Sequence, residues 1–306
     1  MEKVLIRAVV LAVAAASVIA ASAVPAGAGP KEDAIWARLR TRLERIDQSL
    51  DGVLGLSLKD LKTGATLEIR PDEPFPQASV IKLAVLYELY RQADEGKVNL
   101  SEVTRPPATR VSGGGILQEL GASVSLTWRD LAVLMMGWSD NSATNVLIER
   151  VGLDAVNRRL DSLGLTKTRL RRRMMDLEAA RRGEENVSTP GEMRRLIEAI
   201  YAGTGLSPER AKDIRLVAAV TKSTPFRAPL PEGLVVLDKD GELEGVRCAA
   251  AVVDLPGRPY AITIMTTYLR KDDDGDASIR EVSAAVFETM DRLARSSDLG
   301  RIISER

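Results

Sequence analysis

A serine and a lysine, Ser79 and Lys82, stand three residues apart at the start of a predicted helix. Residues at this spacing share one helical face, so the hydroxyl and the amine can approach each other. The helix is expected over about 79–95, and its first turns are apolar nearly all round, which is typical of a buried helix. Burial disfavours an ammonium group and lowers a lysine pKa, so Lys82 is a candidate base for a Ser79 nucleophile. About one S-x-x-K is expected by chance in a chain of this length, so the pair alone does not identify a site.

A second candidate segment is Ser139-Asp140-Asn141, which follows a predicted helix over about 127–138 and precedes another helix. If the Ser139 hydroxyl faces the first pair, it could relay a proton to a leaving nitrogen. The Asn141 amide could orient a substrate carbonyl and bond the lysine. The structural alternative is helix capping, for which Ser, Asp and Asn are the preferred residues.

A third candidate is Lys239-Asp240-Gly241, predicted at the end of a strand. Its lysine supplies a second amine, and Gly241 is small enough to let a substrate approach the backbone. The structural alternative is an ordinary strand-end turn, because Asp and Gly are common turn residues.

Composition limits the chemistry that these residues can support. The 306 residues include no histidine and one cysteine, which excludes imidazole relays and His-ligated zinc sites. Lys and Arg total 43, as do Asp and Glu, and aromatic residues make up 4%. This balance gives no general attraction for nucleic acid. Cys248 lacks a disulfide partner and is expected to be a small core residue in a strand. We expect no cofactor and no metal.

The N-terminal residues are typical of a signal peptide. Lys3 and Arg7 precede a mostly apolar run over 8–24, and small residues within 21–28 offer cleavage sites. We therefore predict that residues 1–28 are a signal peptide and that the protein is exported, periplasmic or extracellular, without stable membrane insertion after cleavage. An uncleaved membrane anchor is the alternative, although the run is short for a bilayer span.

Strand patterns occupy both ends of the remaining chain, and helical patterns lie between them. The expected elements are a helix over 31–50, a hairpin over 53–69, strands over 234–237, 247–253 and 260–267 separated by turns at Asp240-Gly241 and Pro256-Gly257, and a helix over 278–294. Thr127, Thr189 and Ser207 mark helix starts between them. The order predicts an α+β fold, an antiparallel β-sheet flanked by N- and C-terminal helices with an inserted all-α lobe. We expect one domain over 30–306, with an α/β lobe at about 30–78 and 225–306, a helical lobe at about 79–224, and a site between them.

In this order and context, the three candidate segments resemble the signatures of the class A β-lactamase and penicillin-binding protein superfamily, which are S-x-x-K, S-D-N and K-T-G. The likeness covers essentially the whole mature chain. It extends to the flanking segments 75–82, 113–118 and 131–145. The resemblance implies an active-site serine hydrolase in which Ser79 is acylated, Lys82 is its base partner and Ser139 relays a proton.

The resemblance also implies how a substrate would be held. Asn141 would contact the substrate, and Lys239 would anchor a substrate carboxylate, with Arg247 as a possible second clamp. The oxyanion hole would consist of the backbone N–H groups of Ser79 and Glu242.

Two departures limit how much activity the resemblance implies. Class A enzymes carry a Glu-x-x-Leu-Asn motif whose glutamate activates the deacylating water, but no such motif occurs near Arg173, where a gapless count places it. Asp176 and Glu178 are the nearest carboxylates and the candidate deacylation acids. The basic run 169–173 is interpreted as a solvated face paired with Glu184 and Glu185.

The second departure is Asp240, which stands where the family has Thr or Ser. That hydroxyl helps to hold a substrate carboxylate, whereas a carboxylate at this position repels one unless Lys239 or Arg247 neutralises it.

Three functions remain open at this point. The leading hypothesis is an exported serine hydrolase that opens β-lactams or related cyclic amides through an acyl-enzyme on Ser79. The runner-up is a penicillin-binding, D,D-peptidase-like enzyme acting on cell-wall peptides. The third is a non-catalytic binding module that has kept the fold. In each case we expect a monomer with a small-molecule or peptide ligand.

Overall fold

A five-stranded antiparallel sheet lies at the centre of the computed structural model, with the strand order β2-β1-β9-β8-β7. The model describes residues 29–107, 109–297 and 299–303, so the predicted signal peptide at 1–28 lies outside the described residues. The strands are β1 Val53–Asp60, β2 Thr66–Ile69, β7 Val236–Leu243, β8 Val246–Val253 and β9 Tyr260–Thr267. Both ends of the chain thus supply strands to one sheet, as the α+β prediction requires.

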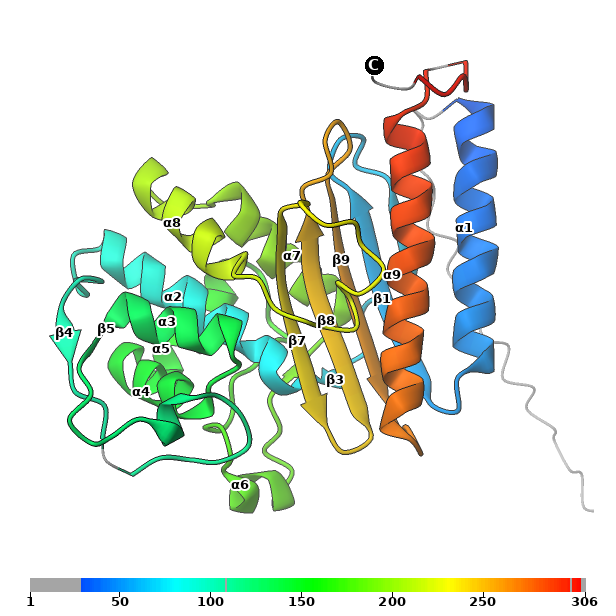
Figure 1. The fold of residues 1–306 in the computed structure, drawn as a ribbon. Coiled ribbons are helices and arrows are strands. Elements are labelled where there is room, and N and C mark those ends of the chain that lie inside the picture. The colour runs from blue at the N-terminus through cyan, green and yellow to red at the C-terminus, as the bar shows by residue number, and fades with distance from the viewer. Residues whose placement is uncertain (1–28, 108, 298, 304–306) are drawn as a thin grey trace, which may run out of the picture.

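Helices cover both faces of this sheet (Figure 1). On one face, α1 (Pro30–Ser49) and α9 (Asp272–Ala294) pack together, and on the other lie α7 (Pro190–Ala202) and the rest of the helical lobe. Seven of the eight residues are buried in both β8 and β9. Strands covered on both faces carry continuous apolar runs rather than alternating ones, which explains this pattern. Two hydrophobic cores result, one on each side of the sheet.

The C-terminal helix α9 begins six residues earlier than the sequence pattern predicts, at Asp272 rather than Ser278. Its first turn contains Asp272, Asp273 and Asp274, whose negative charges are favoured at a helix N-terminus. Apolar periodicity appears only where the helix packs on the sheet, so it does not detect this acidic turn.

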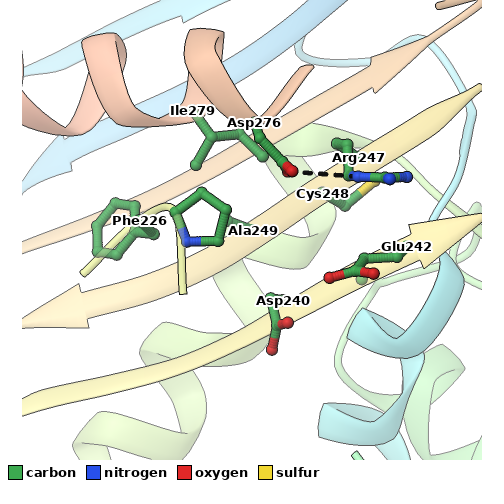
Figure 2. A pocket seen from close by; sticks show the side chains of 10 residues that line it. Phe226, Asp240, Glu242, Arg247, Cys248, Ala249, Asp276 and Ile279 are labelled. Carbon is green, nitrogen blue, oxygen red and sulfur yellow. Dashed lines mark ion pairs between the residues drawn. The ribbon is translucent and has the colours of Figure 1, made fainter. Parts of the chain in front are cut away.

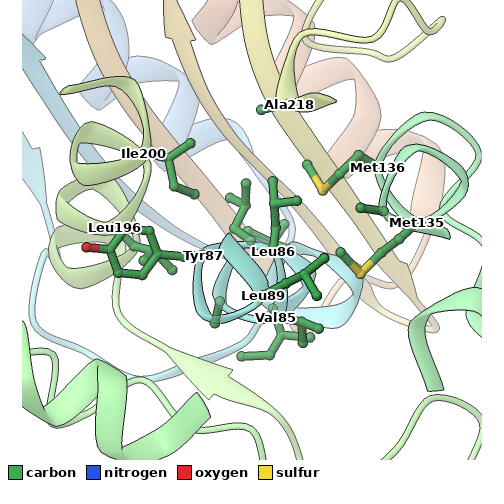
Figure 3. Close-up of a cluster of buried hydrophobic side chains, with 14 of the residues drawn as sticks. Val85, Leu86, Tyr87, Leu89, Met135, Met136, Leu196, Ile200 and Ala218 are labelled. Carbon is green, nitrogen blue, oxygen red and sulfur yellow. The ribbon is translucent and has the colours of Figure 1, made fainter. Parts of the chain in front are cut away.

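The inserted lobe is built around one central helix, α2. The lobe comprises η1 Ala78–Ile81, α2 Lys82–Asp94, η2 Leu117–Glu119, α3 Trp128–Gly137, α4 Asn141–Val151, α5 Leu153–Ser162, α6 Leu177–Arg181, α7 and α8 Pro208–Ala218. Eleven of the thirteen residues of α2 are buried. Figure 3 shows Leu86 and Leu89 of α2 among Met135 of α3 and Leu196 and Ile200 of α7. The predicted buried helix is confirmed, and its first turn is a 3₁₀ helix that ends just before Lys82.

Two short two-stranded sheets connect loops of the lobe. β3 (Phe75–Pro76) pairs with β6 (Val187–Ser188), and β4 (Val103–Thr104) pairs with β5 (Leu126–Thr127). The first of these sheets holds the segment that precedes Ser79 against the end of the loop that runs from Arg169 to Ser188.

The predicted helix starts are confirmed. The side chains of Thr127, Thr189 and Ser207 accept hydrogen bonds from backbone N–H groups three residues later, at the N-termini of α3, α7 and α8. Each such cap satisfies an N–H group that has no partner within the helix.

The turn predicted at Asp240-Gly241 is wrong. β7 continues through both residues to Leu243, and Asp240 pairs with Ala249 of β8. The chain reverses instead at Glu244-Gly245, where Gly245 has φ +70°. Asp-Gly is a turn signal for an isolated segment, but eight register pairs with β8 keep it extended here.

Three further observations concern the chain outside the motifs. Cys248 is buried in β8, as predicted, and burial raises the pKa of its thiol to about 12. Within the described part of the chain, no helix combines the length and apolar character that a bilayer span requires. The described residues also include no cluster of three or more His, Cys, Asp or Glu side chains suited to a metal ion.

Candidate active site

The ammonium nitrogen of Lys82 joins the first two motifs. Lys82 is fully buried and is the first residue of α2. Its Nζ donates to Ser79 Oγ at 2.9 Å, Ser139 Oγ at 3.0 Å, the Ser139 carbonyl oxygen at 2.7 Å and Asn141 Oδ1 at 2.9 Å. The structure therefore brings together Ser79, Lys82, Ser139 and Asn141, the four residues that the motifs predict.

The environment of Lys82 favours its neutral amine. Burial lowers the pKa of Lys82 well below its ordinary value, and the charge of Lys239 lowers it further. The carboxylates of Asp240 and Asp140 oppose this shift without cancelling it. A neutral amine at 2.9 Å from a hydroxyl can accept its proton, which an ammonium cannot do.

Two residues beside this cluster have a strained backbone. Ala78, directly before Ser79, has φ +47°, and Ser139 has φ +51°. A non-glycine residue in this left-handed region costs on the order of 1–3 kcal/mol and persists only where its surroundings impose it. Here both residues shape the turns that present the two hydroxyl groups to Lys82.

A glycine-rich loop is fixed against the second motif. Asp140 caps α4 by accepting from Ala143 N, and it also accepts from Leu117 N. Asn141 Nδ2 donates to the carbonyl oxygens of Ser112 and Gly113. A Cβ on Gly115 would overlap the carboxylate and the Cα of Asp140, so this close approach requires glycine.

The third motif approaches the nucleophile through its glycine. A Cβ on Gly241 would lie 2.8 Å from the Gln77 carbonyl oxygen and 3.0 Å from Ser79 N. Lys239, two residues earlier on β7, is also fully buried, and its Nζ donates to Asp240 Oδ1 and to the Asp240 carbonyl oxygen. The β7 edge thus abuts the turn that carries Ser79.

Comparisons with known proteins identify the family. A family model described as the β-lactamase enzyme family matches residues 38–290. The chain belongs to this family. The β-lactamase of Streptomyces cellulosae is 34% identical over 255 residues, covering 80% of this chain and 81% of that protein, and that of Streptomyces albus G is 30% identical over 312 residues, covering 93% and 96%.

Solved structures of the β-lactamase family share the fold. The β-lactamase of Sphaerobacter thermophilus superposes with a TM-score of 0.76 at 26% identity, over 84% of this chain and 98% of that one. An ancestral class A β-lactamase gives 0.76 at 29% identity over 82% and 99%, and PBP-A gives 0.75 at 28% identity over 83% and 96%. The predicted α+β fold and class A β-lactamase family of serine hydrolases are therefore confirmed.

We expect Gly241→Ala to slow covalent labelling of Ser79 by about 10-fold or more, because displacing reactive groups by even 1 Å can reduce rates by about 100-fold. The added methyl group would push β7 away from Gln77 and Ser79. Labelling by a β-lactam, followed by intact mass, measures the effect. Gly121→Ala is the matched control, since nothing lies within 4 Å of its Cβ position. A Gly241→Ala rate equal to that of the control would contradict this role.

A buried group of ion pairs surrounds Asp238, the residue directly before Lys239 in β7, and no motif in the sequence indicates it. Asp238 is 1% exposed and accepts from Arg227 Nε at 2.9 Å and Nη2 at 2.7 Å. Lys222 Nζ lies 3.1 Å from the same carboxylate oxygen, and burial lowers the pKa of this lysine. Lys222 and Arg227 belong to a loop without periodicity, so no sequence pattern indicates that they pair with Asp238 of β7.

Arg247 is not a hydrogen-bond partner of Lys82 or Ser79 among the described contacts, but it lines a pocket with Asp240, Gly241 and Glu242, so its role as a second carboxylate clamp stays a prediction. It lies on the α9 side of the sheet, where its guanidinium pairs with Asp272 at 3.1 Å and with Asp276 at 3.3 Å. Figure 2 shows the pair with Asp276. In the register of β7 with β8, Arg247 pairs with Glu242, so these two side chains and that of Asp240 lie on one face of the sheet, whereas Gly241 faces η1. The side chain of Glu242 is exposed, and only its backbone adjoins the Gly241 contact.

The candidate deacylation acids lie at the surface. Asp176 and Glu178 are exposed, and Asp176 caps the short helix α6 by accepting from Ala179 N. Neither is a hydrogen-bond partner of Lys82 or of Ser79 among the described contacts. The loop backbone is instead held at Met174, which exchanges two hydrogen bonds with Asn145 of α4. Met174 itself is 7% exposed and packs in the core.

The basic run 169–173 is only partly the solvated face that was predicted. Arg173 is exposed and lies 3.7 Å from Glu149, whereas Arg172 is 8% exposed and pairs with Glu185 as expected. Glu184 pairs with Arg182 instead. The backbone of this run pairs with the end of the same loop, because Arg169 forms a bridge with Val187, and Arg171 N and Arg172 N donate to Asn186 Oδ1.

Proposed function

We propose that this protein opens β-lactams or related cyclic amides through an acyl-enzyme on Ser79. The observation that carries the proposal is the contact between Lys82 Nζ and Ser79 Oγ, 2.9 Å long, at a buried lysine whose pKa is lowered. Family membership supports the reaction class, and the named β-lactamase relatives support the substrate.

In the proposed acylation step, Lys82 accepts the Ser79 proton while Oγ attacks the amide carbonyl carbon. Negative charge develops on the carbonyl oxygen, and the N–H groups of Ser79 and Glu242 are the donors assigned to it. The C–N bond then breaks, and the leaving nitrogen takes a proton from Ser139, which Lys82 can resupply across 3.0 Å. Asn141 holds the lysine in place at 2.9 Å.

Release of the acyl group requires water to attack the ester and return a proton to Ser79. Asp176 and Glu178 remain the candidate acids for this step, but both are exposed. This observation favours the second candidate, a penicillin-binding enzyme in which the lactam stays covalently bound. PBP-A is among the similar structures, and a point mutant of PBP-A has been solved as an acyl-enzyme complex with penicillin G.

We also infer that the protein is exported, on the signal-peptide pattern of residues 1–28. Cell-wall peptides and antibiotics are both reached outside the cytoplasm, so this inference fits either candidate function.

Incubation of the purified protein with a chromogenic cephalosporin, followed by colour and intact mass, tests the proposal. We expect a mass increase on Ser79, together with colour in excess of one equivalent if release is fast, or limited to one equivalent if the adduct persists. Ser79→Ala should form no adduct, because the nucleophilic oxygen is absent. If the wild-type protein also forms no adduct and no excess colour, both enzymatic candidates fail for this substrate class.

A further inference from the structure

Asp240 departs from the K-T-G signature at a position beside the nucleophile. It lies between Lys239 and Gly241, and a Cβ on Gly241 would reach within 3.0 Å of Ser79 N. The charge of Asp240 also acts on Lys82, whose pKa it raises against the larger effects of burial and Lys239. Asp240 is therefore within electrostatic reach of the groups that act on the substrate.

The carboxylate of Asp240 neutralises the lysine that would anchor a substrate carboxylate. Its Oδ1 accepts from Lys239 Nζ at 2.9 Å. Burial alone would raise the pKa of Asp240, but the charge and hydrogen bond of Lys239 lower it below its ordinary value, so Asp240 is ionised at neutral pH. The Lys239 side chain is fully buried while 25% of the Asp240 side chain is exposed, so the accessible end of this pair is the anion.

The neighbouring cations are already paired. Lys222 and Arg227 both bind Asp238, behind the site. Arg247 lines the same pocket as Asp240 and Glu242, and its guanidinium is paired there with Asp272 and Asp276 of α9.

A second carboxylate, that of Glu242, follows Asp240 on the same face of β7 (Figure 2). It is exposed, and it stands just beyond Gly241. Two carboxylates therefore flank the glycine that abuts Ser79, and the two described cations beside them, Lys239 and Arg247, each already pair with aspartates.

We propose that this site selects substrates carrying an uncharged hydrogen-bond donor, such as a carboxamide, in place of the carboxylate that a K-T-G hydroxyl would help to hold. A carboxamide N–H group can donate to the accessible Asp240 carboxylate, whereas a substrate carboxylate is repelled by it. The inference rests on the proposed function, because it specifies the substrate class of the same acylation reaction.

Three ligands that differ in one group test this selection: benzylpenicillin, its methyl ester and its primary amide. The ring and acyl side chain are unchanged among them, so rates of mass addition to Ser79 isolate the effect of charge and hydrogen bonding. We expect the primary amide to acylate the wild-type protein at least about 10-fold faster than the free acid, since like charges at a binding site are strongly disfavoured. The methyl ester, neutral but without a donor, should lie between them.

The variant Asp240→Asn removes the charge and keeps the shape of the side chain. We expect it to raise the free-acid rate by about 10-fold and to lower the primary-amide rate, because the acid is no longer repelled while the amide loses its charged acceptor. Glu244→Gln, in the exposed turn after β7, is the matched control that removes a carboxylate remote from Ser79. Each comparison is a ratio of rates within one preparation, so partly folded protein does not alter it.

A faster reaction with the free acid than with the amide in the wild type would overturn the inference, as would an amide-to-acid ratio that Asp240→Asn leaves unchanged. Either result, obtained with normal labelling of Ser79, leaves the proposed function standing. If none of the three ligands labels wild type or Asp240→Asn, the proposed function fails and the inference fails with it.

Discussion

Replacing Lys82 by methionine is expected to slow acylation of Ser79 by about 100-fold or more, within the range of about 10²–10⁴ that general base catalysis contributes. Methionine fills a similar volume in the buried helix but offers no nitrogen to accept the Ser79 proton. The contacts at 2.9 Å to Ser79 and 3.0 Å to Ser139 are lost together, so both proton transfers are affected. The measurement is the rate of mass addition by a chromogenic cephalosporin.

The pH dependence gives this prediction a second readout. Acylation by the wild type should rise as the pH increases through the lowered pKa of Lys82, because the neutral amine is the active form. Lys82→Arg should be slow at every pH, since a guanidinium does not deprotonate in proteins.

The stability of the folded protein depends on the same titration. Between the lowered pKa of Lys82 in the folded protein and the ordinary value of 10.5, the unfolded chain holds a proton that the folded one lacks. The free energy of unfolding of the wild type should therefore rise with pH relative to Lys82→Met in that window.

Lys97→Met is the matched control, because Lys97 is an exposed lysine that pairs with Glu95 at the surface. It should acylate at the wild-type rate. If Lys82→Met did so as well, the proton would have to go to another group, and the lysine mechanism would be wrong.

The cluster of Ser79, Lys82, Ser139 and Asn141 was predictable from sequence because most of its signals are local. The three-residue spacing of Ser79 and Lys82 places both at one helix start, and the apolar residues after Lys82 indicate burial. Ser139 and Asn141 bracket a helix cap, so their loop position is also a local property. The contact between Lys82 and Ser139, which are 57 residues apart, is not a local property. Its prediction depended on the resemblance to a known family.

The parts that the sequence did not predict depend on tertiary pairing. The side chains of Arg247, Asp240 and Glu242 share one face of the sheet because of the register of β7 with β8, and a one-residue change in register reverses the face. The extension of β7 through Asp240 and Gly241 depends on the same pairing. The ion pairs of Asp238 with Lys222 and Arg227 join a strand to a loop, which no periodicity reveals.

The second large effect is expected for Arg227→Ala, which should lower the free energy of unfolding by about 3 kcal/mol, the lower end of the range for breaking a buried ion pair. Asp238 is 1% exposed, and Arg227 provides two of its hydrogen bonds together with one to the Val236 carbonyl oxygen. Lys222 remains beside the carboxylate, which places the effect at the low end. For a chain of this size, such a loss corresponds to a fall in Tm of roughly 6–12 °C, measured by calorimetry or circular dichroism.

Two comparisons show whether the loss of stability in Arg227→Ala comes from an unpaired buried charge or from lost packing. Arg42→Ala removes an exposed pair with Glu288 and should change stability by less than about 1 kcal/mol. The double variant Arg227→Ala/Asp238→Asn should be less destabilised than the sum of the single variants, because it leaves no unpaired carboxylate under β7. Additive effects would instead mean that Arg227 acts by packing alone. Asp238 directly precedes Lys239 in β7, the strand that holds Gly241 against Ser79. An unpaired charge on Asp238 would therefore loosen this strand. The Arg227–Asp238 pair thus links the stability of the sheet edge to the geometry of the site.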